Sequence, residues 1–240
     1  GRYLTLSLEA LSRREEEAFP RSVRVLAALV ETLLPPLDSA APVLIAGLGS
    51  RSITPDAVGP RSADHVIATR HLISRSPEFF ASWRPVSVLA PGVLGQTGVE
   101  TGEIVRGVLD HVRPRAVIAI DALAAGRLSR LVRTVQLADT GIVPGSGVNN
   151  ARAALDRQTL GVPVVSIGVP TVADGGSLAH EIAQQLDGAQ CEALDDLSQP
   201  FIITTRDIDR EVADTARLIG YAVNMALQHI SVEEIDLYLS

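Results

Sequence analysis

Short apolar segments that alternate with helical patterns constrain most what this chain can fold into. Each segment is rich in β-branched or other aliphatic residues and is bounded by Gly or Pro, which is typical of a buried strand. The four segments are Val43–Ala46, Val86–Ala90, Ala116–Ile120 and Val164–Ile167. Helical patterns cover Pro20–Leu34, Asp56–Ser74, Gly102–Val112, Ala122–Arg133, Ser177–Leu186 and Ile208–His229. This order predicts an α/β fold, a three-layer sandwich with a mainly parallel central sheet.

Composition agrees with this prediction and excludes several classes of protein. Of the 240 residues, 46% are hydrophobic and only 3% are aromatic, which suits an aliphatic core between helices and a sheet. The net charge of −7 argues against a nucleic-acid partner, which would favour a basic surface. No apolar run is long enough to predict a membrane span, so we expect a soluble intracellular protein. A single cysteine, Cys191, excludes an internal disulfide and a cysteine-based zinc site.

The chemistry is expected where polar turns follow the strands. Ligands bind at the carboxyl ends of the strands in an open parallel sheet. Asp56 follows the first strand in "GLGSRSITPDAVGP", and Asp121 follows the third in "DALAAGRLSR", so both carboxylates are expected at one edge. Two carboxylates held close together share a proton, because they cannot both ionise cheaply. Such a pair can activate water for aspartic-type hydrolysis of a peptide bond.

A structural interpretation competes with this one. Thr54 and Pro55 suit the start of a helix, where the macrodipole favours a carboxylate such as Asp56. Asp121 would in the same way cap a helix that begins at Ala122. The residues alone leave the catalytic pair and the two independent caps both open. The five histidines have no H-E-x-x-H spacing, and the sequence predicts no metal site and no cofactor.

Seven ordered blocks of the sequence resemble the germination protease (spore protease) family of endospore-forming bacteria. The blocks are "GLGSRSITPDAVGP", "TRHL", "PGVLGQTGVET", "AIDALAAGRLSRL", "VQLADTGIVPGSGVNNAR", "TLGVPVVSIGVPTVAD" and "FIITTRDID". The resemblance implies an atypical aspartic endopeptidase whose fold is similar to that of hydrogenase maturation proteases. It also implies a zymogen, a homotetramer, a location in the cytoplasm of the spore core, and small acid-soluble spore proteins as substrates.

The resemblance assigns the catalytic pair to Asp56 in "TPDAVGP" and Asp121 in "IDALAA". The loops "PGVLGQTGVETGE" and "PGSGVNNAR" are expected to flank the pair and to present backbone amides to an extended substrate. The candidate substrate-binding residues are Ser50, Gly95, Thr97, Gly145, Ser146 and Gly147. Three departures from the family pattern occur: Ser50 in place of Asn, Asn149 in place of Gly, and Gly175-Gly176 after Asp174.

Further expectations concern the protonation of the pair and the extent of the chain. We expect Asp56 to be the more ionised member, because it lies near a helix N-terminus, and Asp121 to be the more protonated one after its apolar strand. Residues 1–240 are expected to form a single peptidase domain that lacks an upstream segment with the propeptide. Two alternatives remain open, a metal-dependent peptidase similar to hydrogenase maturation proteases and a catalytically silent binding or regulatory relative.

Overall fold

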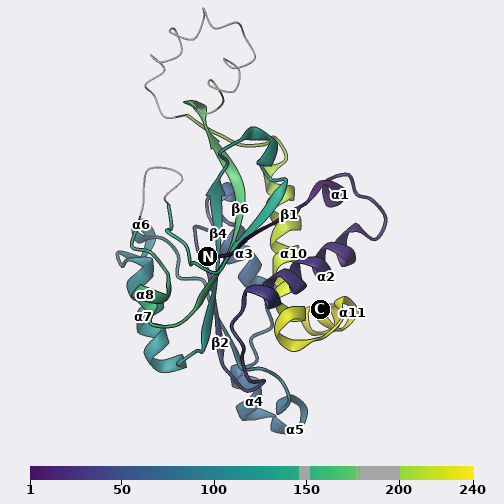
Figure 1. The fold of residues 1–240 in the computed structure, drawn as a ribbon, viewed down its shortest axis with the longest axis vertical. Helices are drawn as coiled ribbons and strands as arrows, with labels where there is room; N and C mark the ends of the chain where they lie inside the picture. The colour runs from purple at the N-terminus through teal and green to yellow at the C-terminus, as the bar shows by residue number, and fades with distance from the viewer. Residues whose placement is uncertain (146–151, 177, 179–200) are drawn as a thin grey trace, which may run out of the picture.

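A seven-stranded mixed sheet forms the centre of the computed structural model, which describes residues 1–145, 152–176, 178 and 201–240 (Figure 1). The strand order is β1-β5-β6-β4-β2-β3, with β7 paired to the end of β6. Strands β3, β2, β4 and β6 are mutually parallel, whereas β5 runs antiparallel to both of its neighbours. The strands are β1 (Tyr3–Ser7), β2 (Val43–Gly47), β3 (Val86–Leu89), β4 (Ala116–Ala124), β5 (Thr134–Ala138), β6 (Val164–Asp174) and β7 (Ile202–Ile203).

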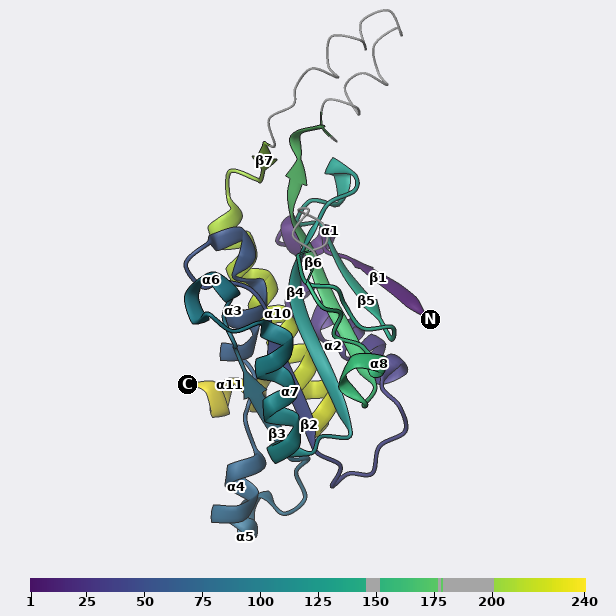
Figure 2. The same ribbon diagram turned by 90° about the vertical axis from the view of Figure 1, so that its left-hand side faces the viewer.

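Helices cover both faces of the sheet and make the predicted three layers (Figures 1 and 2). One face packs against α2 (Ala18–Leu33), α3 (Val58–Asp64) and α10 (Ile208–Gln228), and the other against α7 (Thr101–Val112) and α8 (Arg157–Leu160). The other helices in the described ranges are α1 (Glu9–Ser12), α4 (Arg70–Arg75), α5 (Pro77–Phe80), α6 (Leu94–Thr97) and α11 (Val232–Leu239). No helix in the described ranges has the length and hydrophobicity needed to span a bilayer.

Two hydrophobic cores follow from the alternation of side chains along the central strands. Ile45 of β2 and Ile118 of β4 point to the α2/α10 side, where both are fully buried. Leu44 and Val117, their sequence neighbours, point to the α7/α8 side and are buried equally well. Strands buried on both faces read as continuous apolar runs, which is why β2 and β4 were recognisable in the sequence.

The predicted helix Ala122–Arg133 is wrong, because β4 continues to Ala124. The residues after Asp121 pair with the extended strand β6, which runs to Asp174 and thus well past its predicted end at Ile167. The rest of the predicted range contains a 3-10 turn, Leu128–Arg130, and strand β5 begins directly after it at Thr134. Pairing in the sheet therefore overrides the helical preference of the small residues in "ALAA".

The predicted helix Asp56–Ser74 is broken into the 3-10 turn η1 (Thr54–Asp56), α3 and α4. Ile53, and not Thr54, occupies the N-cap position of η1, and the Thr54 hydroxyl instead donates a hydrogen bond to Asp209 Oδ1 at 2.8 Å. The predicted helix Ser177–Leu186 and Cys191 lie outside the described residues, apart from position 178.

Glycines let α3 lie directly on the ends of β2 and β4. A Cβ atom on Gly59 would be 2.2 Å from the Leu48 carbonyl oxygen and 2.4 Å from that of Ile120. A Cβ atom on Gly47 would be 2.3 Å from the Gly59 carbonyl oxygen. The chain before α3 is thereby held close to the carboxyl end of β4, where the two candidate aspartates lie.

Candidate active site

Asp56 is held by the turn that follows β2. The Ser50 backbone N–H donates a hydrogen bond of 2.7 Å to Asp56 Oδ2. Gly49, which precedes Ser50, has a φ of +107°, and a Cβ atom there would be 2.1 Å from the Asp56 carbonyl oxygen. Only glycine fits a backbone in this conformation at such close approach. The "GLGS" turn therefore serves to bring the Asp56 carboxylate to the end of the sheet.

Asp121 lies within β4, opposite Gly168 of β6. Its side chain is buried, with 5% of the residue surface exposed, and its Oδ1 accepts a hydrogen bond of 2.9 Å from the Ala122 N–H. A Cβ atom on Gly168 would be 2.4 Å from the Leu123 side chain. The glycine therefore leaves room for Leu123, which lines the cavity two residues after Asp121.

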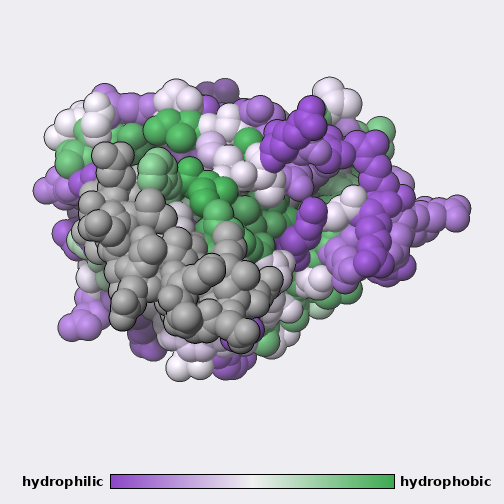
Figure 3. Space-filling view, turned by 90° about the horizontal axis from the view of Figure 1, so that it is seen from above, coloured by the Kyte–Doolittle hydropathy of each residue, from purple (hydrophilic) through white to green (hydrophobic). Residues whose placement is uncertain are grey.

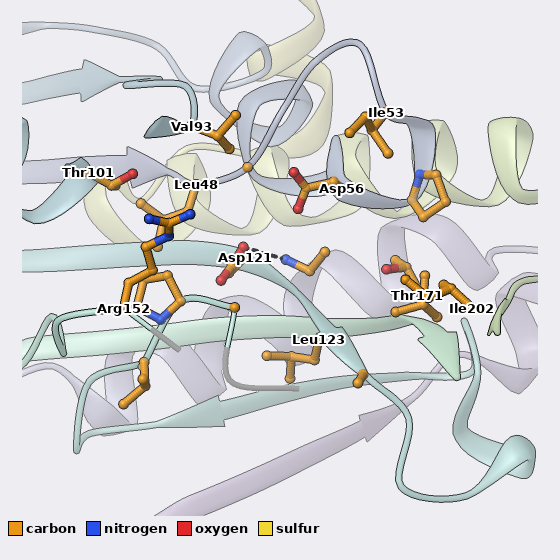
Figure 4. A pocket seen from close by; sticks show the side chains of 18 of the residues that line it. Leu48, Ile53, Asp56, Val93, Thr101, Asp121, Leu123, Arg152, Thr171 and Ile202 are labelled. Carbon is orange, nitrogen blue, oxygen red and sulfur yellow. Dashed lines mark hydrogen bonds between the residues drawn. The ribbon is translucent and has the colours of Figure 1, made fainter. Parts of the chain in front are cut away.

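Both aspartates line one cavity of about 330 Å³. Figure 4 shows the two side chains coming from different elements, with Asp56 on the turn after β2 and Asp121 on β4. Most of the other lining residues are apolar: Leu48, Ile53, Pro55, Val93, Leu94, Leu123, Val143, Pro144, Val172 and Ile202. A view onto this end of the molecule shows hydrophobic residues gathered beside hydrophilic ones (Figure 3). The arrangement is an apolar pocket with few polar groups, which is typical of a ligand-binding site.

Burial sets the ionisation of the pair. Burial, followed by the nearby charge of Asp56, raises the pKa of Asp121 to about 7, although the Ala122 N–H lowers it in part. Burial also raises the pKa of Asp56, and the hydrogen bond from the Ser50 N–H opposes this rise. One proton can therefore stay on the pair near neutral pH. The ionised form of Asp56 is thus favoured by the hydrogen bond from the Ser50 N–H. The expected helix N-terminus is not at Asp56, because α3 begins only at Val58.

The structure contradicts the interpretation of the two aspartates as helix caps. Neither η1 nor α3 has a side-chain hydrogen bond at its N-cap. Asp121 precedes three more strand residues, so no helix begins at Ala122. Both carboxylates are instead held by single backbone N–H groups and line the same cavity.

Of the candidate substrate-binding residues that the structure describes, only Gly145 lines the cavity. Gly145 lines the cavity, whereas Gly95 and Thr97 are exposed on α6 and are not among the described residues that line it. Ser50 is 1% exposed, and its hydroxyl lies 2.9 Å from Ser52 Oγ and from Gln96 Nε2, so it supports the turn that holds Asp56. Ser146 and Gly147 lie outside the described residues.

Sequence reasoning did not single out most residues of the cavity wall, among them Arg152, Thr171 and Ile202. Arg152 lies inside the motif "VNNAR" and pairs with Glu100 at 2.9 Å, and it was not singled out. Thr171 and Ile202 reach the cavity because β6 is longer than predicted and pairs with β7. Within the described ranges, no group of three or more His, Cys, Asp or Glu side chains could hold a metal ion.

Comparison with known proteins identifies the family to which this chain belongs. The profile of the family described as "Germination protease" matches residues 1–187. The chain belongs to the germination protease family. A germination protease from Caldanaerobacter subterraneus subsp. tengcongensis is 39% identical over 255 residues, which cover 95% of this chain and 78% of that protein. One from Clostridium acetobutylicum is 34% identical over 270 residues, covering 100% of this chain and 83% of that protein.

Other relatives match over a shorter range. The germination protease of Bacillus subtilis (strain 168) is 46% identical over 184 residues, which cover 75% of this chain and 50% of that protein. Among solved structures, the [NiFe] hydrogenase maturation protease HycI from Thermococcus kodakarensis KOD1 aligns with 81% of this chain and 98% of its own, at 17% identity and a TM-score of 0.44. Membership of the family makes this protein a peptidase of spore germination.

Proposed function

We propose that this peptidase hydrolyses peptide bonds by activating a water molecule between Asp56 and Asp121. The observation that carries the proposal is the pair of carboxylates on one cavity, with the pKa of Asp121 raised to about 7 by burial and by the charge of Asp56. A buried carboxyl that keeps its proton near neutral pH can act as an acid, while its ionised partner acts as a base.

In the proposed mechanism Asp56 is the base and Asp121 the acid. The ionised Asp56 takes a proton from water as the water oxygen attacks the carbonyl carbon of the substrate. The proton of Asp121 passes to the carbonyl oxygen, which would otherwise carry a negative charge in an apolar cavity. As the C–N bond breaks, the leaving nitrogen takes the proton from Asp56, and Asp121 recovers its proton from the tetrahedral hydroxyl. The cycle returns both carboxyl groups to their initial state.

The biological setting is proposed from the resemblance to the family. We propose small acid-soluble spore proteins as the substrates, the spore core as the location, and activation of a zymogen as the control. We also propose a homotetramer, and no cofactor enters the mechanism. Light scattering from the purified protein checks the assembly, and a stable monomer would contradict it.

The test compares Asp56→Asn, Asp121→Asn and the double variant with the wild type on a small acid-soluble spore protein. Each single variant should lose about 10²- to 10⁴-fold in rate, the range for a lost acid or base. The double variant should be no worse than either single one, because the residues act as a unit. Folding should survive, since the amide Oδ1 can still accept the hydrogen bonds from Ser50 and Ala122.

The aspartate variants test the catalytic pair, and a chelator tests the competing metal-dependent mechanism. Near wild-type proteolysis by either single variant would refute the pair. A metal-dependent peptidase is the competing mechanism, and it predicts that incubation with a chelator abolishes the wild-type activity. The pair predicts that the chelator leaves the activity unchanged.

A further inference from the structure

Thr171 lines the cavity, and its buried hydroxyl has no hydrogen-bond partner. Thr171 is fully buried in β6, and its Oγ1 is one of the few buried polar atoms in the described residues that no other group pairs. Figure 4 shows Thr171 and Ile202 at one end of the cavity and Thr101 and Arg152 at the other, with the two aspartates between them. Thr171, with its unpaired hydroxyl, thus lies on the cavity wall to one side of the catalytic pair.

Every other polar side chain on the described wall has a partner. The Thr101 hydroxyl donates to the Gly92 carbonyl oxygen at 3.3 Å, and Arg152 pairs with Glu100 at 2.9 Å. Asp56 and Asp121 accept their backbone hydrogen bonds, as described above. Thr171 is therefore the polar side chain of this wall that is left for a bound molecule.

A β-bulge places Thr171 there, and hydrogen bonds hold the bulge in place. The pairing of β4 with β6 shifts between Leu123 and Ala124, so that Thr171 is the extra residue on β6. Its own carbonyl oxygen accepts a hydrogen bond of 2.7 Å from the Thr204 hydroxyl. The carbonyl oxygens of Pro170 and Val172 each accept a backbone hydrogen bond of 2.7 Å as well. The backbone around the hydroxyl is thus fixed on both sides, and bulges beside active sites commonly aim a side chain.

We propose that the Thr171 hydroxyl hydrogen-bonds a main-chain amide of the bound peptide. This inference rests on the proposed function, since it takes the cavity as the place where the peptide is cleaved. A buried hydroxyl without a partner destabilises a protein, so native structures keep few of them. A hydroxyl can donate to a carbonyl oxygen or accept from an N–H, and a polypeptide main chain offers both at every residue. Thr171 therefore holds the substrate beside the scissile bond and takes no proton itself.

The test is the nearly isosteric Thr171→Val, compared with Thr171→Ser, which keeps the hydroxyl. Thr134→Val is the matched control, because the Thr134 Oγ1 is also buried and unpaired but lies on β5, outside the cavity. Both valine variants should unfold at the same or a higher urea concentration than the wild type, since each removes an unpaired hydroxyl. Only Thr171→Val should lower kcat/KM, by about tenfold, the size of one lost hydrogen bond. Thr171→Ser should recover most of the loss.

A second measurement separates binding from stability and from the mechanism. In the Asp121→Asn background, fluorescence anisotropy with a labelled spore-protein peptide should show about tenfold weaker binding when Thr171→Val is added. Unchanged kcat/KM in Thr171→Val, or unchanged binding in this background, would overturn the inference while the pair stands. If Asp121→Asn itself cleaves the substrate at the wild-type rate, the proposed function fails, whatever Thr171→Val does.

Discussion

Replacement of Asp121 by Asn should stabilise the protein at high pH and leave its stability unchanged at low pH. Burial and the charge of Asp56 raise the pKa of Asp121 from 3.8 to about 7. A group whose pKa is raised on folding contributes its stability below the unfolded-state pKa and loses it as the pH rises through the folded-state pKa. The wild type therefore loses stability between about pH 4 and pH 7, because the carboxyl ionises in the unfolded state while it stays protonated in the folded state. The amide of the variant stays neutral in both states.

The size of the effect follows from the same pKa. A rise from 3.8 to about 7 corresponds, at about 1.4 kcal/mol per pH unit, to at most about 4 kcal/mol of unfolding free energy. The measured difference should be smaller, because the carboxylate lies on an open cavity and can draw water to itself. We expect Asp121→Asn to exceed the wild type by about 1–4 kcal/mol at pH 8, with the difference vanishing near pH 4.

Urea unfolding followed by circular dichroism at pH 4, 6 and 8 measures this difference. Asp110→Asn, which changes an exposed aspartate on α7, is the control for the substitution as such. If Asp121→Asn were less stable than the wild type at pH 8, the carboxylate would be favoured in its ionised form. That result would refute the assignment of the shared proton to Asp121 and, with it, the division of roles between acid and base.

Two further predictions concern the glycines near the cavity. Gly49→Ala should destabilise the protein by about 2 kcal/mol or more and abolish proteolysis. The reason is that φ is +107° and the added Cβ would lie 2.1 Å from the Asp56 carbonyl oxygen. A variant that is stable in urea unfolding and active in a peptidase assay would contradict this tight turn. Gly95→Ala should change stability by less than about 0.5 kcal/mol and leave proteolysis intact, because a Cβ there meets no atom within 4 Å. A large loss of activity in Gly95→Ala, with folding intact, would support the earlier assignment of Gly95 to substrate binding.

The helices and strands with strong periodicity could be predicted from the sequence, and those stabilised by pairing with distant residues could not. The predicted helices Pro20–Leu34 and Ile208–His229 agree with α2 and α10 to within about two residues. Both carry a continuous apolar stripe over several turns, which is a local signal. The second halves of β4 and β6 give no such signal. Their residues, Ala122–Ala124 and Gly168–Asp174, include Pro170 and small residues, and they form strands because they pair with each other.

In the candidate site, too, the residues placed by local patterns could be predicted and those placed by long-range pairing could not. Asp56 and Asp121 could be placed together because each follows an apolar strand, and the carboxyl ends of parallel strands meet at one edge. Thr171 and Ile202 could not, because their position depends on the bulge in β6 and on its pairing with β7, which long-range hydrogen bonds decide. The structural roles of Gly49 and Gly59 could not be predicted either, because a Cβ at each would clash with atoms that are distant in the sequence.

The unpredicted extension of β4 also bears on the chemistry proposed for Asp121. A helix-capping aspartate would lie at a loop end, where water and several backbone N–H groups favour its charge. In the structure the chain continues as a strand after Asp121, so the carboxyl is 5% exposed and accepts a hydrogen bond from the single N–H of Ala122. Burial of this kind favours the neutral acid. Asp56, on the turn after β2, is less buried and receives the Ser50 N–H. The two aspartates thus differ in environment because one belongs to a strand and the other to a turn. In the proposed mechanism, this difference lets Asp121 donate a proton while Asp56 accepts one.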